Sequence, residues 1–255
     1  MEHKSDVRLE IKNVSKSFEA GQAEKSEVVK NVSLKVYNNE FLVILGPGRC
    51  GKSVLLNMIA GLLPVDEGEI LLDGKPIKGV NPKVGMVFQK LGLMPWLTVM
   101  ENVEFGLKMR GIDKKTRREK AQHFIEMVGL EGFEKHYPYQ LSGGMKQRAG
   151  IARAYTDDVE ILIMDEPFGQ LDAQTRYNMQ QEIVRIAEKD KRTIIFVTNN
   201  IEEALKVGDR IILFTKCPAQ VKEIYPVNMK KPRDEISEEF LKMREVVSEN
   251  TDLAL

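Results

Sequence analysis

The sequence predicts an α/β protein with a mixed sheet, and three observations carry this prediction. Residues 7–18 and 28–37 alternate apolar and polar side chains, as strands do in a sheet with one solvated face. Residues 41–45, FLVIL, are continuously apolar, as in a strand that is covered on both faces. Later in the chain, apolar strands alternate with helical patterns. Antiparallel pieces followed by strand–helix alternation indicate a mixed α/β core with an antiparallel β subdomain.

The remaining elements follow in chain order. A helix is expected over residues 54–63, VLLNMIAGLL, because its apolar residues have helical spacing. Residues roughly 95–160 are helix-rich and have few β-branched runs, so we expect a helical subdomain inserted into the core. The predicted division is one domain over 1–225 and a C-terminal extension over 226–255 that ends in a surface helix. Further strands are expected at residues 68–74, 83–89, 160–166, 193–198 and 210–214.

Composition excludes several classes of protein. The chain has 255 residues, with 38 Lys and Arg against 38 Asp and Glu, and such a balance argues against bulk nucleic-acid binding. The longest apolar runs are about five residues, whereas a membrane-spanning helix needs ~20. The charged N-terminus lacks the apolar core of a signal peptide, so a cytoplasmic protein is expected. Two cysteines are too few for a disulfide framework or a zinc site.

Residues 46–53, GPGRCGKS, form a candidate phosphate-binding loop. They fit the pattern G-x-x-x-x-G-K-[ST], follow an apolar strand and open the predicted helix. Backbone N–H groups and the helix dipole would hold phosphates, Lys52 would add a charge, and the Ser53 hydroxyl would ligate Mg²⁺. The alternative is a glycine-rich turn without a ligand. The expected nucleotide-binding residues here are Gly46, Pro47, Gly48, Arg49, Cys50, Gly51, Lys52, Ser53 and Val54.

Two residues of this loop are unusual. Arg49 stands where such loops often have glycine, and because arginine disfavours positive φ, we expect a slightly different loop. Cys50 lies beside Arg49, near Lys52 and close to a helix start, which favours a lowered thiol pKa. The alternative is that Cys50 is only a small side chain that fills a tight turn.

Residues 160–167, EILIMDEP, are an apolar strand that ends in two carboxylates. Asp165 suits a water-mediated hold on Mg²⁺. Glu166 is then placed to act as general base toward the attacking water. The alternative is a turn with a helix cap, but a phosphate site needs a carboxylate for its metal. The sequence therefore predicts that these two residues serve phosphoryl chemistry.

The stretch LSGGMKQR, residues 141–148, lies between the loop and the acid pair. With these three motifs in this order, the sequence resembles the ATP-binding subunits of ABC transporters over almost the whole chain. The resemblance implies a P-loop NTPase-type mixed sheet core, and ATP hydrolysis with ATP and Mg²⁺ bound. It implies that Phe18 stacks on adenine and that Gln89 senses Mg²⁺ and contacts a membrane partner. It implies a signature that closes on the γ-phosphate bound by the opposite subunit, with the residues Ser142, Gly143, Gly144 and Gln147. It also implies that a loop aspartate, Asp172, crosses the dimer interface.

The signature also has a physical interpretation, because SGG followed by a helix is a second backbone anion site. One chain holds one phosphate-binding loop and one signature. Two ATP-binding subunits, identical or not, would therefore form two complete sites in a head-to-tail dimer. The amino-acid sequence resembles the nitrate/sulfonate/taurine (bicarbonate) importer branch at residues 93–111, 164–176 and 230–240. This branch implies separate transmembrane permease subunits and an extracytoplasmic solute-binding protein for a small anionic solute. It also implies peripheral attachment to the cytoplasmic face of the membrane.

Other functions stay open at this stage. The chain could serve a different transport system, because the resemblance to this importer branch rests on similar sequence and not on chemistry derived from the residues. ABC proteins that act on nucleic acid usually carry two cassettes or long coiled-coil insertions, and this chain shows one cassette. Trp96, in LMPWLTV at 93–99, is expected either in a groove that receives a membrane subunit or in the core of the helical subdomain.

Asn199 and Asn200 depart from the family pattern, which has histidine and then aspartate after the strand at 193–198. An amide keeps a donor for the γ-phosphate but cannot carry charge or move a proton. Losing such a donor altogether costs ~10²–10³ in rate, so we expect a smaller loss here. Three interpretations compete: a working ATPase, a regulatory subunit with weak hydrolysis, or an asparagine that only caps the next helix, for which Asn200 is as good. We predict the working ATPase, with Asn199 as a catalytic donor.

Overall fold

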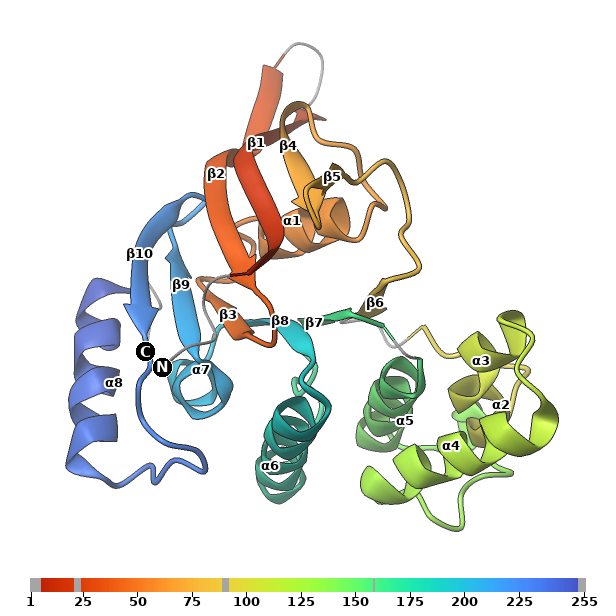
Figure 1. Cartoon of the computed structure of the whole chain (residues 1–255). Helices are drawn as coiled ribbons and strands as arrows, with labels where there is room; N and C mark the ends of the chain where they lie inside the picture. The colour runs from red at the N-terminus through yellow and green to blue at the C-terminus, as the bar shows by residue number, and fades with distance from the viewer. Residues whose placement is uncertain (1–5, 21–23, 89–91, 158, 252–255) are drawn as a thin grey trace. The chain divides into compact units, whose positions relative to one another are not determined.

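The computed structural model describes residues 6–20, 24–88, 92–157 and 159–251 of the chain (Figure 1). The chain forms two compact units, one from Met1–Pro82 with Val184–Leu255 and one from Lys83–Ile183. The first unit carries antiparallel strands early in the chain and a parallel sheet with helices later. The second is mainly helical. The predicted α/β class with an antiparallel β part is confirmed.

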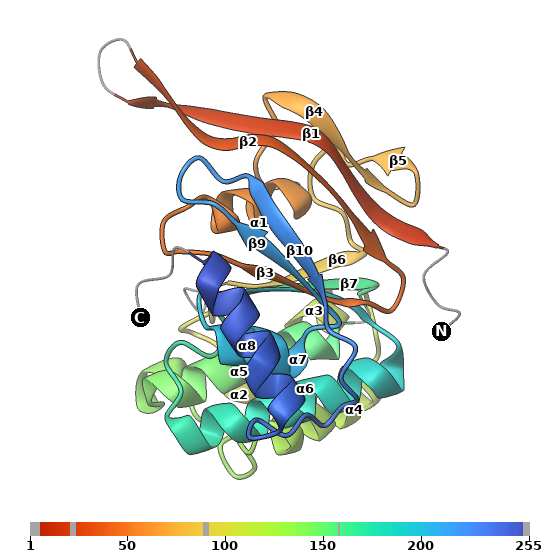
Figure 2. The same ribbon diagram turned by 90° about the vertical axis from the view of Figure 1, so that its left-hand side faces the viewer.

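In the first unit, the described residues include a four-stranded antiparallel sheet in the order β2-β1-β4-β5. β1 and β2 form the long ribbon of Figure 2, and their alternating pattern buries one face, with Leu9, Ile11 and Val14 almost inaccessible. The two-residue strand at the edge was not predicted. The bounds are β1 Val7–Ala20, β2 Glu24–Tyr37, β4 Glu67–Leu72 and β5 Lys75–Pro76.

The same unit contains the parallel sheet that positions the phosphate loop. β3 (Phe41–Leu45) pairs in parallel with β8 (Thr193–Thr198) and with β9 (Arg210–Phe214). β10 (Val221–Pro226), which was not predicted, pairs antiparallel with β9. Every residue of FLVIL is buried, as its unbroken apolar pattern predicts.

Helices α1 (Lys52–Ile59), α7 (Ile201–Val207) and α8 (Glu238–Asn250) also belong to this unit. The prediction of a helix over 54–63 was wrong at both ends. The helix begins two residues earlier, inside the phosphate loop. It ends before Gly61, which has φ +71° and lies so close to Gly79 that a Cβ would meet the carbonyl oxygen at 1.9 Å.

In the second unit, β6 (Val84–Val87) pairs in parallel with β7 (Ile161–Asp165). The expected helices are present and gather around α4 and α5 in Figure 1. Their bounds are α2 Val99–Val103, α3 Phe105–Met109, α4 Lys114–Met127, the 3₁₀ turn η1 Pro138–Gln140, and α5 Gly143–Thr156.

The remaining helix, α6 (Ala173–Asp190), begins in the second unit and ends in the first. Within the described ranges, no helix is both long enough and apolar enough to span a membrane. The division of the sequence into a domain over 1–225, an insertion over 95–160 and an extension from 226 stays a prediction.

Candidate functional site

The phosphate loop follows β3 directly and turns sharply at Gly51. Gly51 has φ +113°, and a Cβ at this position would lie 2.6 Å from the carbonyl oxygen of Val28. Only glycine fits this conformation and this space. Arg49 has φ +62°, so it adopts the left-handed conformation that arginine disfavours, at a cost of about 1–3 kcal/mol. Arginine therefore takes the positive φ that glycine often takes in such loops, and a different loop conformation stays a prediction.

The loop ends at the N-terminus of α1, which has no side-chain cap. The N–H groups of the first turn have no acceptor within the helix, because the first four donors of any α-helix lie before its hydrogen-bonding pattern begins. The helix dipole adds partial positive charge at this end. These donors form an anion-binding cradle, since a helix N-terminus of this kind favours phosphate groups.

Lys52 is buried and lies against the loop itself. Only 4% of the residue is exposed, and its Nζ donates to the carbonyl oxygens of Gly46 at 2.8 Å and Pro47 at 2.7 Å. The predicted phosphate-binding lysine therefore has internal partners. A phosphate group would have to compete with two carbonyls for this ammonium group.

Cys50 is almost fully buried in the turn, with 1% exposed. Burial raises the pKa of the Cys50 thiol, and the charge of Lys52 opposes this only in part. The interpretation of a reactive, acidified thiol is wrong. The alternative interpretation, a small side chain that fills a tight turn, agrees with its burial.

Asn199 lies at the same edge of the sheet as the phosphate loop. Leu45 of β3 is paired with Thr198 of β8, so Gly46 and Asn199 leave neighbouring parallel strands side by side. Such strands are about 4.8 Å apart. The structure therefore places Asn199, to which the resemblance assigns a γ-phosphate contact, next to the phosphate loop within one unit of the chain.

The contacts of this edge distinguish the two asparagines. The Oδ1 atom of Asn200 accepts the N–H of Glu203 at 2.8 Å and caps α7. Asn199 is exposed and is not the cap, so the capping interpretation of Asn199 is wrong.

One buried pair at this edge was missed by the sequence analysis. The hydroxyl of Thr198 donates to Glu203 Oε2 at 2.5 Å and accepts the N–H of Asn200 at 3.1 Å. Both Thr198 and Glu203 are less than a tenth exposed. The spacing of Asn200 and Glu203, a cap followed three residues later by Glu, is the sequence signal that marks such a pair.

In the second unit, the acid pair ends β7. Asp165 is buried at the last position of the strand, and Glu166 follows in the turn with φ +45° and is half-buried. A glutamate with positive φ is uncommon, and such strained residues cluster at functional sites. The carbonyl of Glu166 accepts the N–H of Gly169 at 3.3 Å, which closes the turn.

The signature opens α5 in this same unit. The Ser142 hydroxyl caps the helix by accepting the N–H of Met145 at 3.2 Å, and Gly143 and Gly144 form its first turn. Gln147 is buried, and its Oε1 accepts the N–H of Gln170 at 2.9 Å. Gln147 thus holds the loop that follows the acid pair, and its predicted contact with nucleotide stays a prediction.

The other predicted residues lie on exposed parts of the structure or outside it. Asp172 is exposed and accepts the N–H of Thr175 at 2.9 Å, which lowers the pKa of its carboxyl group. Phe18 is 41% exposed on β1, with the Lys16 ammonium 5.7 Å from its ring centre. Gln89 lies outside the described residues. Trp96 is 71% exposed, so the interpretation of Trp96 as core is wrong.

The residues expected to hold Mg²⁺ offer oxygen atoms, the ligands that this ion prefers. Ser53 is exposed in the first turn of α1, beside the cradle. Asp165 contributes a carboxylate. The described residues contain no cluster of three or more His, Cys, Asp or Glu groups placed to hold a metal. Ser53 lies in the first unit and Asp165 in the second; each is of a residue type that Mg²⁺ accepts as a ligand, and the role of each toward the ion stays a prediction.

Comparisons with known proteins agree with this arrangement. A family model described as "ABC transporter" matches residues 29–169, more than half of the chain. An uncharacterised ABC transporter ATP-binding protein of Methanocaldococcus jannaschii is 49% identical over 94% of this chain and 90% of its own length. The aliphatic sulfonates import ATP-binding protein of Bacillus cereus is 41% identical over 94% of each chain.

A solved structure is similar across its whole length. It is a dimeric ATP-binding cassette in a post-hydrolysis state, bound to ADP and inorganic phosphate. It is 34% identical to this chain, with a TM-score of 0.80, and the match covers 87% of this chain and 100% of that one. The resemblance found in the sequence is therefore confirmed: the chain belongs to the ATP-binding proteins of the ABC transporter family, which are ATPases.

Proposed function

We propose that this protein hydrolyses ATP as one of two subunits in a head-to-tail dimer and powers the uptake of a small anionic solute, of the sulfonate kind, through separate permease subunits. The relatives named for aliphatic sulfonate import support the solute class, because they match 94% of the chain. The dimeric solved cassette supports the dimer. The protein would lie at the cytoplasmic face of the membrane. An extracytoplasmic solute-binding protein would deliver the solute to the permease subunits.

The observation that carries the proposal is the cradle at Gly51. Gly51 makes a turn that other residues do not tolerate, with φ +113° and the Val28 carbonyl close by, and the uncapped N-terminus of α1 that follows it favours phosphate groups. Lys52 would exchange its bonds to Gly46 and Pro47 for phosphate oxygens. Phe18 would support the adenine ring by stacking, as exposed aromatic residues do.

We assign the general base to Glu166, which would take a proton from the attacking water. Mg²⁺, when bound, would supply positive charge to the phosphates. Ser53 would ligate this ion, Asp165 would hold it through water, and Gln89 would sense it. From the opposite subunit, the signature residues Ser142, Gly143, Gly144 and Gln147 would close on the γ-phosphate, and Asp172 would cross the interface.

Asn199 would donate a hydrogen bond from its amide to the γ-phosphate. Because the amide is neutral, it stabilises the developing charge less than a protonated histidine would. Catalysis in phosphoryl transfer depends mainly on positioning and on electrostatic stabilisation, and the other groups for both are present. We therefore expect turnover, at a reduced rate.

The permease contact would involve the exposed face around Trp96 in the helical part of the second unit. Trp96 is 71% exposed, and exposed aromatic residues are enriched at protein–protein interfaces. Solute selectivity would belong to the permease and to the binding protein. The solute class is tested by measuring whether aliphatic sulfonates, delivered by the binding protein, stimulate ATPase activity of the assembled transporter more than carboxylates of equal length.

Steady-state Mg-ATP hydrolysis of the purified chain tests the main proposal. The native protein is compared with Asn199→His and with Glu166→Gln, which keeps the size of the side chain but removes the base. We expect native turnover clearly above Glu166→Gln, and higher turnover in Asn199→His. Native turnover equal to that of Glu166→Gln would overturn the assignment of a working ATPase.

A second candidate function, a regulatory subunit that binds ATP without useful turnover, is favoured by one observation, the neutral amide at Asn199. The same experiment separates the two. If the native protein binds ATP but hydrolyses it no faster than Glu166→Gln, and Asn199→His restores activity, the protein is a nucleotide-controlled switch.

A further inference from the structure

The segment that follows β10 is bonded to the C-terminal end of α7. Arg233, only 7% exposed, is the centre of this contact. Its guanidinium Nη1 donates to backbone carbonyls at 2.6, 3.3 and 2.6 Å, which belong to Leu205, Lys206 and Gly208. The last carbonyls of a helix have no partner within the helix, and this end carries the negative side of the dipole. Arg233 supplies both the missing donors and a positive charge.

Two ion pairs flank this arginine, and we call residues 227–235 the α7 clamp. Lys231 pairs with Asp209 at 2.7 Å, and its side chain is 8% exposed. Lys206 of α7 pairs with Glu235. Arg233 also donates within the clamp to Met229 at 3.0 Å and to Val227 at 3.1 Å. Because Arg233 joins carbonyls of α7 to carbonyls of the clamp, the clamp and the helix end are held as one piece.

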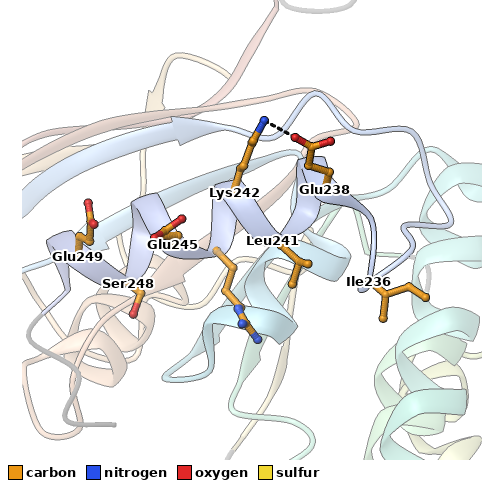
Figure 3. Close-up of a pocket in the computed structure, with 8 residues that line it drawn as sticks. Ile236, Glu238, Leu241, Lys242, Glu245, Ser248 and Glu249 are labelled. Carbon is orange, nitrogen blue, oxygen red and sulfur yellow. Dashed lines mark ion pairs between the residues drawn. The ribbon is translucent and has the colours of Figure 1, made fainter.

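The outer face of α8 carries an exposed ion pair, whereas Arg233 of the clamp is buried. Figure 3 shows the exposed pair of Lys242 and Glu238 on α8, whose charged atoms are 2.6 Å apart. This face borders an open groove of about 710 Å³ lined by residues of the segment 236–249 alone. Exposed pairs of this type contribute little to stability. Lys242 is thus a cation of the same C-terminal region that is not part of the clamp.

The opposite end of α7 leads directly to the γ-phosphate position. Asn200 caps the helix, and Glu203 bonds to Thr198, so the residues on both sides of Asn199 are tied to α7. The helix has seven residues, a length of about 10 Å. A hydrogen-bonded path within one unit therefore runs from Arg233 through α7 to the two neighbours of Asn199.

We propose that Arg233 is a positioning residue for ATP hydrolysis, which fixes the C-terminal end of α7 and thereby holds Asn199 beside the phosphate loop. This inference rests on the proposed role of Asn199. A neutral amide contributes through geometry alone, since it has no charge that acts over distance. Its contribution therefore depends on how firmly its strand end and helix are held.

The test is a kinetic cycle in the full-length protein with Arg233→Met, Asn199→Ala and the double variant, and with Lys242→Met as matched control. Arg233→Met keeps most of the side-chain volume but removes every donor. We expect kcat to fall by up to about 10²-fold, the scale of a small misplacement, with KM for ATP unchanged. Arg233→Lys should recover part of kcat, and Lys242→Met should equal the native protein. The double variant should be no slower than Asn199→Ala.

Hydrogen exchange supplies a readout independent of activity. In Arg233→Met, the N–H of Glu203, which bonds to Asn200, should exchange faster, while amides of α1 keep their native rates. If Arg233→Met does not yield folded protein, Arg233→Lys carries both measurements, because it keeps the charge and loses only the planar set of donors.

The outcomes separate this inference from the proposed function. If Asn199→Ala keeps native kcat, the role of Asn199 is wrong and this inference falls with it. If Asn199→Ala is slow but Arg233→Met has native kcat, only this inference is overturned. Independent effects that multiply in the double variant would also overturn it, because Arg233 would then act by another route.

Discussion

Asn199 and Asn200 are adjacent amides whose contacts differ. Asn200 accepts the N–H of Glu203 and begins α7, whereas Asn199 is exposed at the edge beside Gly46. The first is a helix cap, and the second is the residue that we propose to contact the γ-phosphate. The proposal therefore assigns stability and catalysis to two neighbouring positions.

Substituting each asparagine should show this separation. Asn200→Ala removes a helix cap, so unfolding free energy should fall by about 1 kcal/mol and the Tm by about 2–4 °C. Asn199→Ala should leave the Tm unchanged. Scanning calorimetry without nucleotide measures both. Equal losses in the two variants would show that Asn199 also holds the fold.

The thiol of Cys50 makes a pH-dependent prediction. Burial raises its pKa in the folded protein. The thiolate is the reactive form, and each unit of raised pKa lowers its fraction about tenfold. Iodoacetamide at neutral pH should therefore label the exposed Cys217 well before Cys50, as measured by mass spectrometry over time. Early labelling of Cys50 in the folded protein would contradict its burial.

The same shift has a consequence for stability. Because the folded pKa of Cys50 is raised, the unfolded chain loses the proton first as pH rises. The contribution of the neutral thiol is complete below the unfolded pKa and is lost as pH increases through the folded pKa. The Cys50→Ser variant should therefore show a weaker decline in stability at alkaline pH than the native protein.

At the scale of single residues, the sequence predicts where a site lies better than it predicts the contacts that its residues make. The pattern of residues 46–53 was enough to locate the loop, since few side chains other than glycine tolerate its turns. It did not predict that Arg49 adopts positive φ, or that Lys52 bonds to the carbonyls of Gly46 and Pro47. Both depend on how the loop closes in three dimensions.

Among the elements, α1 and its preceding turn depend most on single residues. Gly51→Ala places a Cβ 2.6 Å from the Val28 carbonyl at φ +113°, so unfolding free energy should fall by about 1–3 kcal/mol or more. At Gly48 a Cβ would meet no described atom within 4 Å, so Gly48→Ala is the matched control and should keep the native Tm. Thermal unfolding without nucleotide compares the two. A stable Gly51→Ala would contradict the cradle geometry.

Elements with strong patterns were the predictable ones. β3 and β8 are unbroken apolar runs, and both are strands at the expected residues. The edge strands β5 and β10 were missed, because an edge strand is short or half-exposed and carries little pattern of its own. The α7 clamp was likewise invisible, since its carbonyl acceptors belong to the backbone, and backbone groups leave no mark in a sequence.

For the whole molecule, one phosphate loop and one signature per chain imply assembly. Glu166→Gln should bind ATP without hydrolysing it, so a dimer should accumulate with Mg-ATP and be absent without it. Light scattering after gel filtration measures the mass. Lys52→Met is the control and should stay monomeric, since it lacks the charge that holds the terminal phosphates. A Glu166→Gln protein that stays monomeric with ATP would contradict the head-to-tail arrangement.

The chain order of the motifs predicted the family, because three motifs in sequence rarely coincide by chance. It left the solute open, since no residue of the proposed site contacts the solute. It also did not foresee that the motifs belong to two compact units, with the phosphate loop in one and the signature and acid pair in the other. Contacts between distant residues determine such units, and a single sequence does not display them.

The internal bonds of Lys52 determine which anions the loop can hold. The ammonium group has two backbone oxygen partners, so a ligand that displaces them gains only the difference between the old bonds and the new ones. A single sulfate or phosphate offers little surplus. A polyphosphate engages the helix N-terminus and the ammonium group together, so its advantage is one of multivalency. We therefore expect the loop to bind nucleoside polyphosphates more tightly than it binds single sulfate or phosphate ions.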